Sequence, residues 1–334
     1  MKGDEKVMAP RPIVVLTDES IGREARERLA PIFEVRALPG LYPSEDVLAD
    51  ACAEASAILA RLAVVSRRVI EAAPRLRIIS RHGVGVDAVD LAAATERGIV
   101  VTTTGAANAA AVAEYTFALL LAFARKVRAA DASMRRGEWS RGPLVGLELE
   151  GKTLGIVGLG AIGRRVARQA LGFGMRVLAH DPLLAASPVA DVEMVGFEHV
   201  LARSDIVTLH MRLDPTTHGL IDATAIAAMR PSAILVNTSR GEIVDEAALV
   251  AALREGRLAG AALDTFEAEP LAATSPLRAM ANVILSPHVA GQTHEALARV
   301  GVAAAQAIID ELAGRRPAHV FNPEAYERRG LRGS

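Results

Sequence analysis

The chain has 334 residues, of which 51% are hydrophobic and 3% aromatic, and its formal net charge at pH 7 is −1. The length predicts about two domains, and the near-neutral charge gives no electrostatic reason for binding nucleic acid or an anionic membrane. The lone cysteine, Cys52, cannot form an intramolecular disulfide and is expected to be a small core residue. With a polar N-terminus and no apolar leader, we expect a cytoplasmic protein without nucleic-acid, membrane or metal partners.

Strand-like and helix-like segments alternate over the first hundred residues. Strands are expected at 13–16, 33–37, 57–60 and 76–80. Helices are expected to begin near Ser20, Ser44 and Ser66. This alternation predicts a parallel sheet with crossover helices. The last apolar helix, from about residue 295 to 312, is expected to return to this sheet, so that residues 7–105 and 295–323 form one domain.

The pattern restarts after residue 105. An apolar helix at 109–124 is shorter than the roughly 20 residues that span a bilayer and is expected to be buried between domains or subunits. Strands follow at 153–157, 175–179, 206–209, 233–237, 259–263 and 283–285. The fold class is therefore α/β with two doubly wound parallel sheets, the second in residues 106–294. Residues 1–6 and 324–334 are polar and are expected to be flexible tails.

The middle of the chain carries the spacing of a dinucleotide-binding motif. An apolar strand runs into Gly158, Gly160 and Gly163, a helix follows, and a second strand ends beside Asp181. The glycines permit a tight turn, close approach of a pyrophosphate and close packing of helix on strand, while the helix N-terminus faces the phosphates. Asp181 can accept hydrogen bonds from ribose hydroxyls. Because no Lys or Arg follows at 182–186, NAD is favoured over NADP.

Polar segments follow three later strands, at Asn237–Gly241, Asp264–Pro270 and Ser286–Gly291. Ligands of open α/β sheets bind outside the carboxyl ends of the strands. Arg240 has a planar fork suited to a carboxylate, and His288 can donate and accept a proton. Glu269 can orient the imidazole and stabilise its charged form. These three residues are the candidate catalytic group.

Together with the glycine motif, these segments resemble the D-isomer specific 2-hydroxyacid dehydrogenase family, from about Ile13 to Asn322. The resemblance implies a homodimer whose subunit has a Rossmann domain for NAD and a flavodoxin-like substrate domain. It also implies hydride transfer between the nicotinamide and C2 of a D-2-hydroxyacid or 2-oxoacid. Arg240 then binds the substrate, Glu269 is the acidic partner and His288 is the proton donor.

The resemblance extends to further residues. The expected cofactor-binding residues are Gly158, Gly160, Ala161, Ile162, Gly163, Asp181, His210, Thr238, Ser239, Asp264, His288 and Gly291. The expected substrate-binding residues are Arg61, Arg81, His82, Gly83, Val84, Gly85, Asn108, Arg240 and His288. Within the second set, the backbone near Gly83 and Gly85 can form an anion-binding nest.

The substrate stays open at this point. Arg61, Arg81 and Arg141 resemble arginines that grip the phosphate of 3-phosphoglycerate, but Leu62 and Ala63 replace the hydroxyl residues often found after the first. We expect no regulatory domain of the kind that long phosphoglycerate dehydrogenases carry. A glyoxylate or hydroxypyruvate reductase is equally defensible. The alternative from another class is an NAD(H)-sensing interaction protein of the corepressor type, without physiological turnover.

Overall fold

The computed structural model describes residues 10–332. Residues 1–6, expected to be a tail, lie outside the described residues. Contacts between Cα atoms divide the described chain into two compact units. The first unit combines residues 10–108 with residues 293–332, and the second unit is Ala109–Gln292.

The sheet of the first unit has five parallel strands in the order β2-β1-β3-β4-β5. Its strands are β1 (Ile13–Leu16), β2 (Glu34–Ala37), β3 (Ala55–Ala60), β4 (Ile78–Arg81) and β5 (Val100–Thr102). This order is the flavodoxin-like one, so the predicted fold class is confirmed for this unit. Val14 and Val15 belong to different core clusters, because successive side chains point to opposite faces of a sheet that is buried on both.

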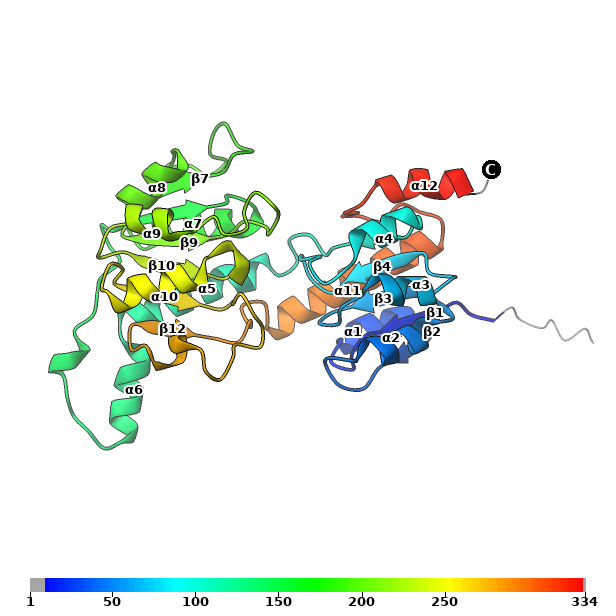
Figure 1. Cartoon of the computed structure of the whole chain (residues 1–334), viewed down its shortest axis with the longest axis horizontal. Coiled ribbons are helices and arrows are strands. Elements are labelled where there is room, and N and C mark those ends of the chain that lie inside the picture. Colours follow the sequence, from blue (N-terminus) through cyan, green and yellow to red (C-terminus); the bar gives the residue numbers. More distant parts are fainter. Residues whose placement is uncertain (1–9, 333–334) are drawn as a thin grey trace, which may run out of the picture. The chain divides into compact units, whose positions relative to one another are not determined.

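Helices cover this sheet. They are α1 (Arg23–Leu29), α2 (Glu45–Cys52), α3 (Arg67–Ala72), α4 (Leu91–Glu96), α11 (His294–Leu312) and α12 (Glu324–Arg332). Those expected near Ser44 and Ser66 begin directly after these residues, whereas the helix expected near Ser20 begins at Arg23, after Gly22, which makes no side-chain cap. The side chains of Ser44, Ser66 and Asp90 each accept a hydrogen bond from the backbone N–H three residues on. The α11 helix packs against α1 and against the sheet (Figure 1).

The expectation of a flexible tail at 324–334 was wrong for its described part, because α12 forms there. The Tyr326 hydroxyl donates to Oε2 of Glu311 at 2.9 Å. The Arg329 guanidinium donates to the carbonyl of Gly98 at 2.8 Å and also pairs with Glu311. Glu311 is only 2% exposed, and a buried carboxylate needs such partners. A polar sequence therefore becomes an ordered helix through contacts with residues distant in the chain.

The second unit has a seven-stranded parallel sheet in the order β12-β11-β10-β9-β6-β7-β8. Its strands are β6 (Thr153–Val157), β7 (Arg176–His180), β8 (Val192–Met194), β9 (Ile206–Leu209), β10 (Ile234–Asn237), β11 (Gly260–Leu263) and β12 (Val283–Leu285). Counted from β6, this is the Rossmann order 3-2-1-4-5-6 with a seventh strand added at one edge. The predicted Rossmann topology is thus confirmed.

The helices of the second unit place its glycine motif and its loops. They are α5 (Ala109–Ala124), α6 (Val127–Arg135), α7 (Ala161–Gly172), α8 (Phe197–Arg203), α9 (Ala223–Ala228) and α10 (Glu246–Arg254). Three short 3-10 helices, η1 (Gly142–Leu144), η2 (Gly241–Ile243) and η3 (Pro276–Ala279), lie in loops. The α7 helix begins directly after Gly160, as the dinucleotide motif requires.

The apolar helix α5 is buried within the second unit itself. We expected burial between domains or subunits, but α5 packs against α7 and against β10, β11 and β12. Its Phe117 ring stacks on Phe173, with 5.1 Å between ring centroids. Among the helices of residues 10–332, none is both long enough and apolar enough to cross a bilayer.

Cys52 lies in α2 and is fully buried, as expected for a core residue. Burial raises the pKa of its thiol to about 12. The thiolate that would act as a nucleophile is therefore scarce at neutral pH. Cys52 has a packing role.

Candidate active site

The three candidate catalytic residues lie at the carboxyl ends of three adjacent strands. Arg240 follows β10, Glu269 lies in the loop after β11, and His288 follows β12. These strands are neighbours in the sheet of the second unit. Because parallel strands all end at the same edge, the three side chains share that edge.

Glu269 and His288 are in direct contact. Nδ1 of His288 lies 2.8 Å from Oε2 of Glu269. The other carboxylate oxygen of Glu269 accepts the backbone N–H of Phe266 at 3.1 Å. With Nδ1–H donated to the carboxylate, Nε2 of His288 is the ring nitrogen left to exchange a proton. The His288 side chain is 46% exposed, so a substrate can reach it.

Glu269 carries a negative charge at neutral pH. Burial alone would raise its pKa, but the hydrogen bond and charge of His288, the N–H of Phe266 and the charge of Arg240 hold the pKa below its usual 4.5. Because the pKa of Glu269 is lower in the folded protein than the usual 4.5, the charged carboxylate stabilises the folded protein at pH values above 4.5. This stabilisation is lost as the pH falls through the lowered pKa.

The Arg240 loop lies close to the Glu269 loop at Gly241. Nδ2 of Asn237 donates to the carbonyl of Arg240 at 2.8 Å. A Cβ placed on Gly241 would overlap the carbonyl group of Phe266. Only glycine therefore lets the two loops approach this closely. We did not single out Gly241 from the sequence, although it is the last residue of the polar segment Asn237–Gly241.

Asp264 holds the loop that carries His288. It is fully buried, and its carboxylate accepts the hydroxyl of Ser286 at 2.5 Å and the backbone N–H groups of Val289 at 3.0 Å and Ala290 at 2.8 Å. Burial raises the pKa of Asp264, and these hydrogen bonds offset part of that effect. His288 has a φ of 52°, a left-handed conformation that needs such support.

Asp264 is an expected cofactor-binding residue, and in the structure its carboxylate is bonded to the loop that carries His288. The carboxylate is enclosed by the loop on which His288 lies, so it acts on the imidazole through the backbone. Ser286, the partner of Asp264, was missed. A polar residue at the end of β12 was the available signal.

The glycine motif fits a dinucleotide. Gly158 has a φ of 95°, and a Cβ there would lie 2.7 Å from the carbonyl carbon of His210. A Cβ on Gly163 would overlap the carbonyl oxygen of Gly158, so this glycine lets α7 pack on the turn. Gly160 is different, because a Cβ there would meet nothing within 4 Å. The open space at Gly160, in front of the exposed N-terminus of α7 at Ala161, is where a pyrophosphate fits.

Asp181 lies beside this turn. Oδ2 of Asp181 accepts the N–H of Leu159 at 2.9 Å, and Oδ1 accepts the N–H of Leu183 at 3.0 Å. Each carboxylate oxygen has a second acceptor site, so Asp181 can still accept bonds from ribose hydroxyls. These two hydrogen bonds fix the Asp181 carboxylate beside the glycine turn, where the ribose of NAD is expected.

Other residues that we expected to bind the cofactor lie at the same edge of the sheet, and two of them make hydrogen bonds within the protein. The Thr238 hydroxyl lies 3.0 Å from that of Thr116, and the Ser239 hydroxyl donates to the carbonyl of Leu209 at 2.6 Å. Burial lowers the pKa of His210 to about 3, so this imidazole is neutral. Nδ1 of His210 is buried without a hydrogen-bond partner within residues 10–332 and can serve a bound group.

The expected substrate residues from Arg61 to Asn108 belong to the first unit. Arg81 is 9% exposed and donates from Nε to the carbonyl of Gly85 at 2.9 Å and from Nη1 to that of Ala60 at 3.3 Å. These bonds stabilise the loop that includes Gly83 and Val84. Burial, with the charges of Arg61 and Arg81, lowers the pKa of His82 to about 4.

Asn108 and Arg141 complete the predicted set. Asn108 ends the first segment of the first unit, and its Oδ1 is a buried acceptor with no partner in the described chain. Arg141 is an exposed residue of the second unit, before η1. The surroundings of Asn108 and Arg141 do not identify a ligand for either residue.

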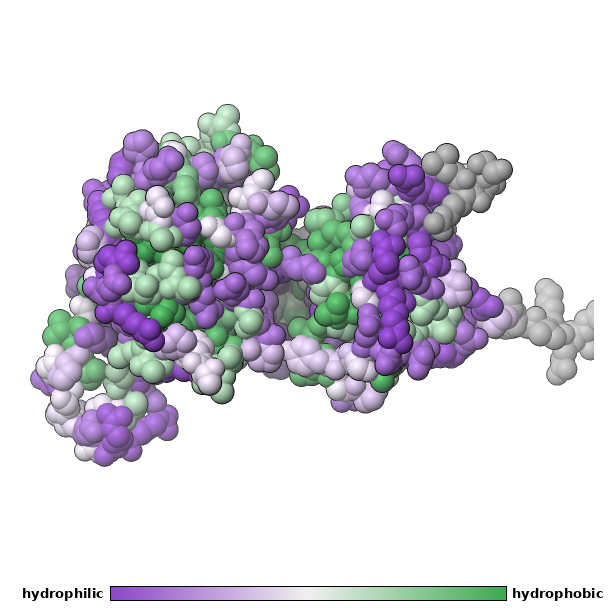
Figure 2. Space-filling model, in the orientation of Figure 1, coloured by the Kyte–Doolittle hydropathy of each residue, from purple (hydrophilic) through white to green (hydrophobic). Residues whose placement is uncertain are grey.

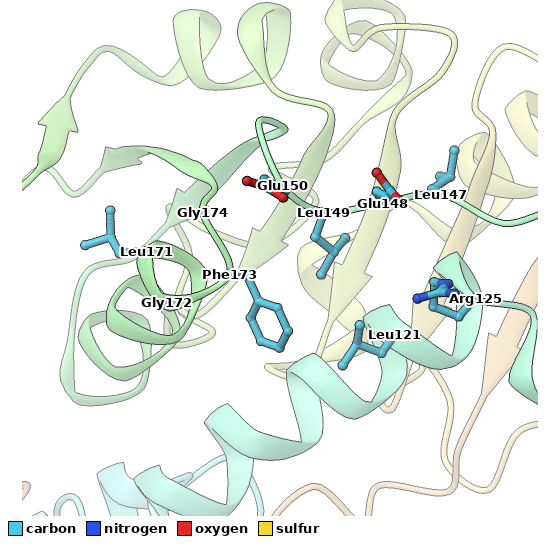
Figure 3. Close-up of a pocket in the computed structure, with 10 residues that line it drawn as sticks. All are labelled: Leu121, Arg125, Leu147, Glu148, Leu149, Glu150, Leu171, Gly172, Phe173 and Gly174. Atoms are coloured by element: carbon cyan, nitrogen blue, oxygen red, sulfur yellow. The ribbon is translucent and has the colours of Figure 1, made fainter.

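One hollow in the surface of the second unit lies away from this chemistry. It has a volume of about 620 Å³ and is lined by the end of α5, residues 147–150 and residues 171–174 (Figure 3). Residues 147–150 precede β6, and residues 171–174 precede β7. The hollow is therefore at the amino edge of the sheet, whereas the glycine motif and His288 are at the carboxyl edge. It is not the cofactor site.

Comparison with known proteins accounts for these features together. Residues 117–290 match the family model described as "D-isomer specific 2-hydroxyacid dehydrogenase, NAD binding domain". The chain belongs to the D-isomer specific 2-hydroxyacid dehydrogenase family. The match covers the glycine motif, Asp181 and all three candidate catalytic residues, which confirms the predicted family and the predicted NAD-binding domain.

Relatives with known names resemble most of the chain. A D-3-phosphoglycerate dehydrogenase of Mycobacterium bovis is 41% identical over 317 residues, which cover 94% of this chain and 58% of the relative. A glyoxylate reductase of Korarchaeum cryptofilum is 41% identical over 289 residues, covering 84% of this chain and 87% of the relative. The chain thus spans a little over half of the first relative's length and most of the second's.

A solved structure supports the fold. The structure of the TT0316 protein from Thermus thermophilus has a TM-score of 0.86 and 38% sequence identity to this chain. The similarity covers 92% of this chain and 99% of that one. The likeness therefore includes both units and not the NAD-binding part alone.

Proposed function

We propose that the protein is an NAD-dependent D-2-hydroxyacid dehydrogenase, which transfers a hydride between the nicotinamide and C2 of a 2-hydroxyacid or 2-oxoacid. The observation that carries this proposal is the group at the ends of β10, β11 and β12, in which Nδ1 of His288 lies 2.8 Å from Oε2 of Glu269. The family relationship supports it. We assign the first unit to the substrate and the second to the cofactor.

Each residue of the group has a distinct task. Bound NADH supplies the hydride. Arg240 binds the substrate carboxylate with its planar fork. Protonated His288 donates a proton from Nε2 to the carbonyl oxygen of a 2-oxoacid and takes it back in the oxidative direction. The charged Glu269 fixes the ring orientation and stabilises the imidazolium.

A spectrophotometric assay tests this function. Oxidation of NADH is followed at neutral pH with glyoxylate, hydroxypyruvate, 3-phosphohydroxypyruvate and pyruvate. Turnover with at least one 2-oxoacid is expected, and no turnover with any of them would contradict the proposal. The alternative of an NAD(H)-sensing interaction protein gains no support from the relatives described above, which are named as a dehydrogenase and a reductase.

Asp181 sets the cofactor preference in this proposal. Its carboxylate lies beside the glycine turn and would repel a 2′-phosphate. We expect Asp181→Ala to raise KM for NADH and to narrow the preference for NADH over NADPH by about tenfold or more, the factor that corresponds to about 1.4 kcal/mol. The ratio of kcat/KM for the two cofactors measures this. An unchanged ratio would remove Asp181 from cofactor selection.

A homodimer belongs to the same proposal. Helix α6 and the loop after it project from the second unit (Figure 1), and this segment mixes apolar with polar residues on its surface (Figure 2). Its exposed apolar side chains are Val127, Met134, Trp139, Val145 and Leu147. Such a cluster is typical of a protein interface, and Trp139, which is 81% exposed, is its largest member.

We expect light scattering after gel filtration to give the mass of two subunits. Trp139→Glu should shift the population toward monomers, because it places a charge in an apolar interface. Tyr42→Glu is the matched control, since Tyr42 is an exposed aromatic residue of the first unit. A parent protein that is monomeric at micromolar concentration would contradict the dimer.

The working compartment is also a proposal. The lone Cys52 is a free, buried thiol. A protein without disulfides fits a reducing compartment such as the cytoplasm.

A further inference from the structure

The loop that follows β4 has a backbone that is open on one side. Its residues Gly83, Val84 and Gly85 are half-buried. A Cβ placed on Gly83, whose φ is 154°, would meet nothing within 4 Å. The N–H groups of these three residues donate no hydrogen bond to the part of the chain that the structure describes. Because neighbouring backbone N–H groups bind anions, this loop has both the space and the donors for a carboxylate.

Thr104 fixes one peptide group of this loop. Its backbone N–H donates to the carbonyl oxygen of Gly83 at 3.0 Å, and its hydroxyl donates to the same oxygen at 3.1 Å. A carbonyl oxygen has two lone pairs, so both are used here. Thr104 is only 3% exposed, so water has little access to compete for these bonds. The carbonyl of Gly83 is therefore held toward Thr104 by two hydrogen bonds.

The geometry of the peptide bond carries this constraint to Val84. The peptide bonds of the loop are trans, and in a planar trans peptide the C=O and the following N–H point in opposite directions. Because Thr104 holds the oxygen of Gly83 on one side, the N–H of Val84 points to the other side. Nε of Arg81 donates to the carbonyl of Gly85 at 2.9 Å and fixes the next part of the loop.

The segment that carries Thr104 is itself held by a distant part of the first unit. Thr102, at the end of β5, forms an antiparallel bridge with Val320. The N–H of Thr103 donates to the carbonyl of His319 at 3.1 Å. These contacts join the segment to residues that follow α11 in the chain. Thr104 is therefore a fixed support for the loop and does not move freely with it.

We propose that Thr104 is a positioning residue for the substrate: by holding the carbonyl of Gly83, it directs the N–H of Val84 at a carboxylate oxygen of the 2-oxoacid. This inference rests on the proposed dehydrogenase function and adds a residue that is not among the expected substrate-binding residues. A donor that is oriented before the substrate arrives loses little entropy on binding. The hydroxyl of Thr104 thus contributes to substrate affinity without touching the substrate.

Thr104→Val tests this role. Valine has a similar shape but lacks the hydroxyl, and the backbone N–H at this position still bonds the carbonyl of Gly83, so no buried group loses all its partners. We expect KM for the 2-oxoacid to rise about fivefold, the effect of one lost hydrogen bond. We expect kcat and KM for NADH to stay within about twofold of the parent values. Steady-state oxidation of NADH, with the 2-oxoacid that the parent turns over fastest, measures all three.

Thr104→Ser and Thr103→Val are the matched variants. Serine keeps the hydroxyl and should return KM to within about twofold of the parent value. Thr103 is half-buried, and its hydroxyl makes no hydrogen bond to residues 10–332, so Thr103→Val should leave KM unchanged. A purely structural role of Thr104 would lower Tm without raising KM. A folded Thr104→Val enzyme with the parent's KM, or an equal rise in Thr103→Val, would overturn the inference and leave the proposed function intact.

A measurement on the parent protein covers the case in which Thr104→Val does not fold. Exchange of the Val84 amide hydrogen is followed by NMR with NADH present, with and without an inhibitory concentration of oxamate, a carboxylate that resembles pyruvate and is not reduced. We expect oxamate to slow this exchange about tenfold, because a hydrogen bond protects an amide. Unchanged exchange would overturn the inference. Absence of NADH oxidation with every 2-oxoacid of the assay would overturn the proposed function, and the inference with it.

Discussion

Replacing His288 with alanine should lower kcat for reduction of a 2-oxoacid by about 10² to 10⁴, the range that general acid–base catalysis contributes. The structure gives the reason, because Nδ1 of His288 is bound to Glu269 and Nε2 is the nitrogen that can serve the substrate oxygen. Alanine leaves the carbonyl oxygen without a positioned proton donor. Steady-state oxidation of NADH with the best substrate of the parent measures this change.

The same variant should bind NADH about as well as the parent does. The glycine motif and Asp181 lie on other loops of the second unit, and their hydrogen bonds do not involve His288. Titration of NADH fluorescence checks this point. His199→Ala is the matched control, since His199 is an exposed histidine of α8 in the same unit. A His288→Ala enzyme that keeps the parent's kcat would exclude His288 as the proton donor.

Replacing Gly241 with alanine should destabilise the protein and lower its activity together. A Cβ at this position would overlap the carbonyl of Phe266, which is backbone and cannot rotate away. Overpacking of this kind costs about 1 to 3 kcal/mol, and each kcal/mol lowers Tm by about 2–4 °C in a protein part of this size. Because the two loops must separate, Arg240 moves away from Glu269 and kcat/KM falls as well.

Thermal unfolding and kinetics on one preparation test the effect of Gly241→Ala. Gly172→Ala is the matched control, because Gly172 ends α7 and a Cβ there meets nothing within 4 Å. Alanine loses less backbone entropy than glycine when it folds into a helix. Gly172→Ala should therefore leave Tm unchanged or raise it slightly. If Gly241→Ala matches the parent in both Tm and kcat/KM, the close approach of the two loops is not needed.

Local patterns were enough to predict most of the architecture. Ser44 and Ser66 mark helix starts because their side chains bond the third N–H of the helix, and both caps are observed. Helix α5 spans Ala109–Ala124, the range predicted from its apolar run. Strands β5 and β8, of three residues each, were missed. Helix α12 was missed because its stability depends on the distant Glu311 and not on its own apolar residues.

The sequence by itself determined the alternation of strands and helices, the glycine motif with Asp181, and the three polar segments that carry Arg240, Glu269 and His288, because each element or motif is encoded by residues close together in the chain. Only the tertiary structure decided how distant segments meet. It bonded Thr104 to Gly83, placed Gly241 against Phe266 and enclosed Asp264 in the loop of His288. Such contacts depend on strand order and burial, which bring residues together whatever their separation in the sequence, and the charge and strain at the site follow from them.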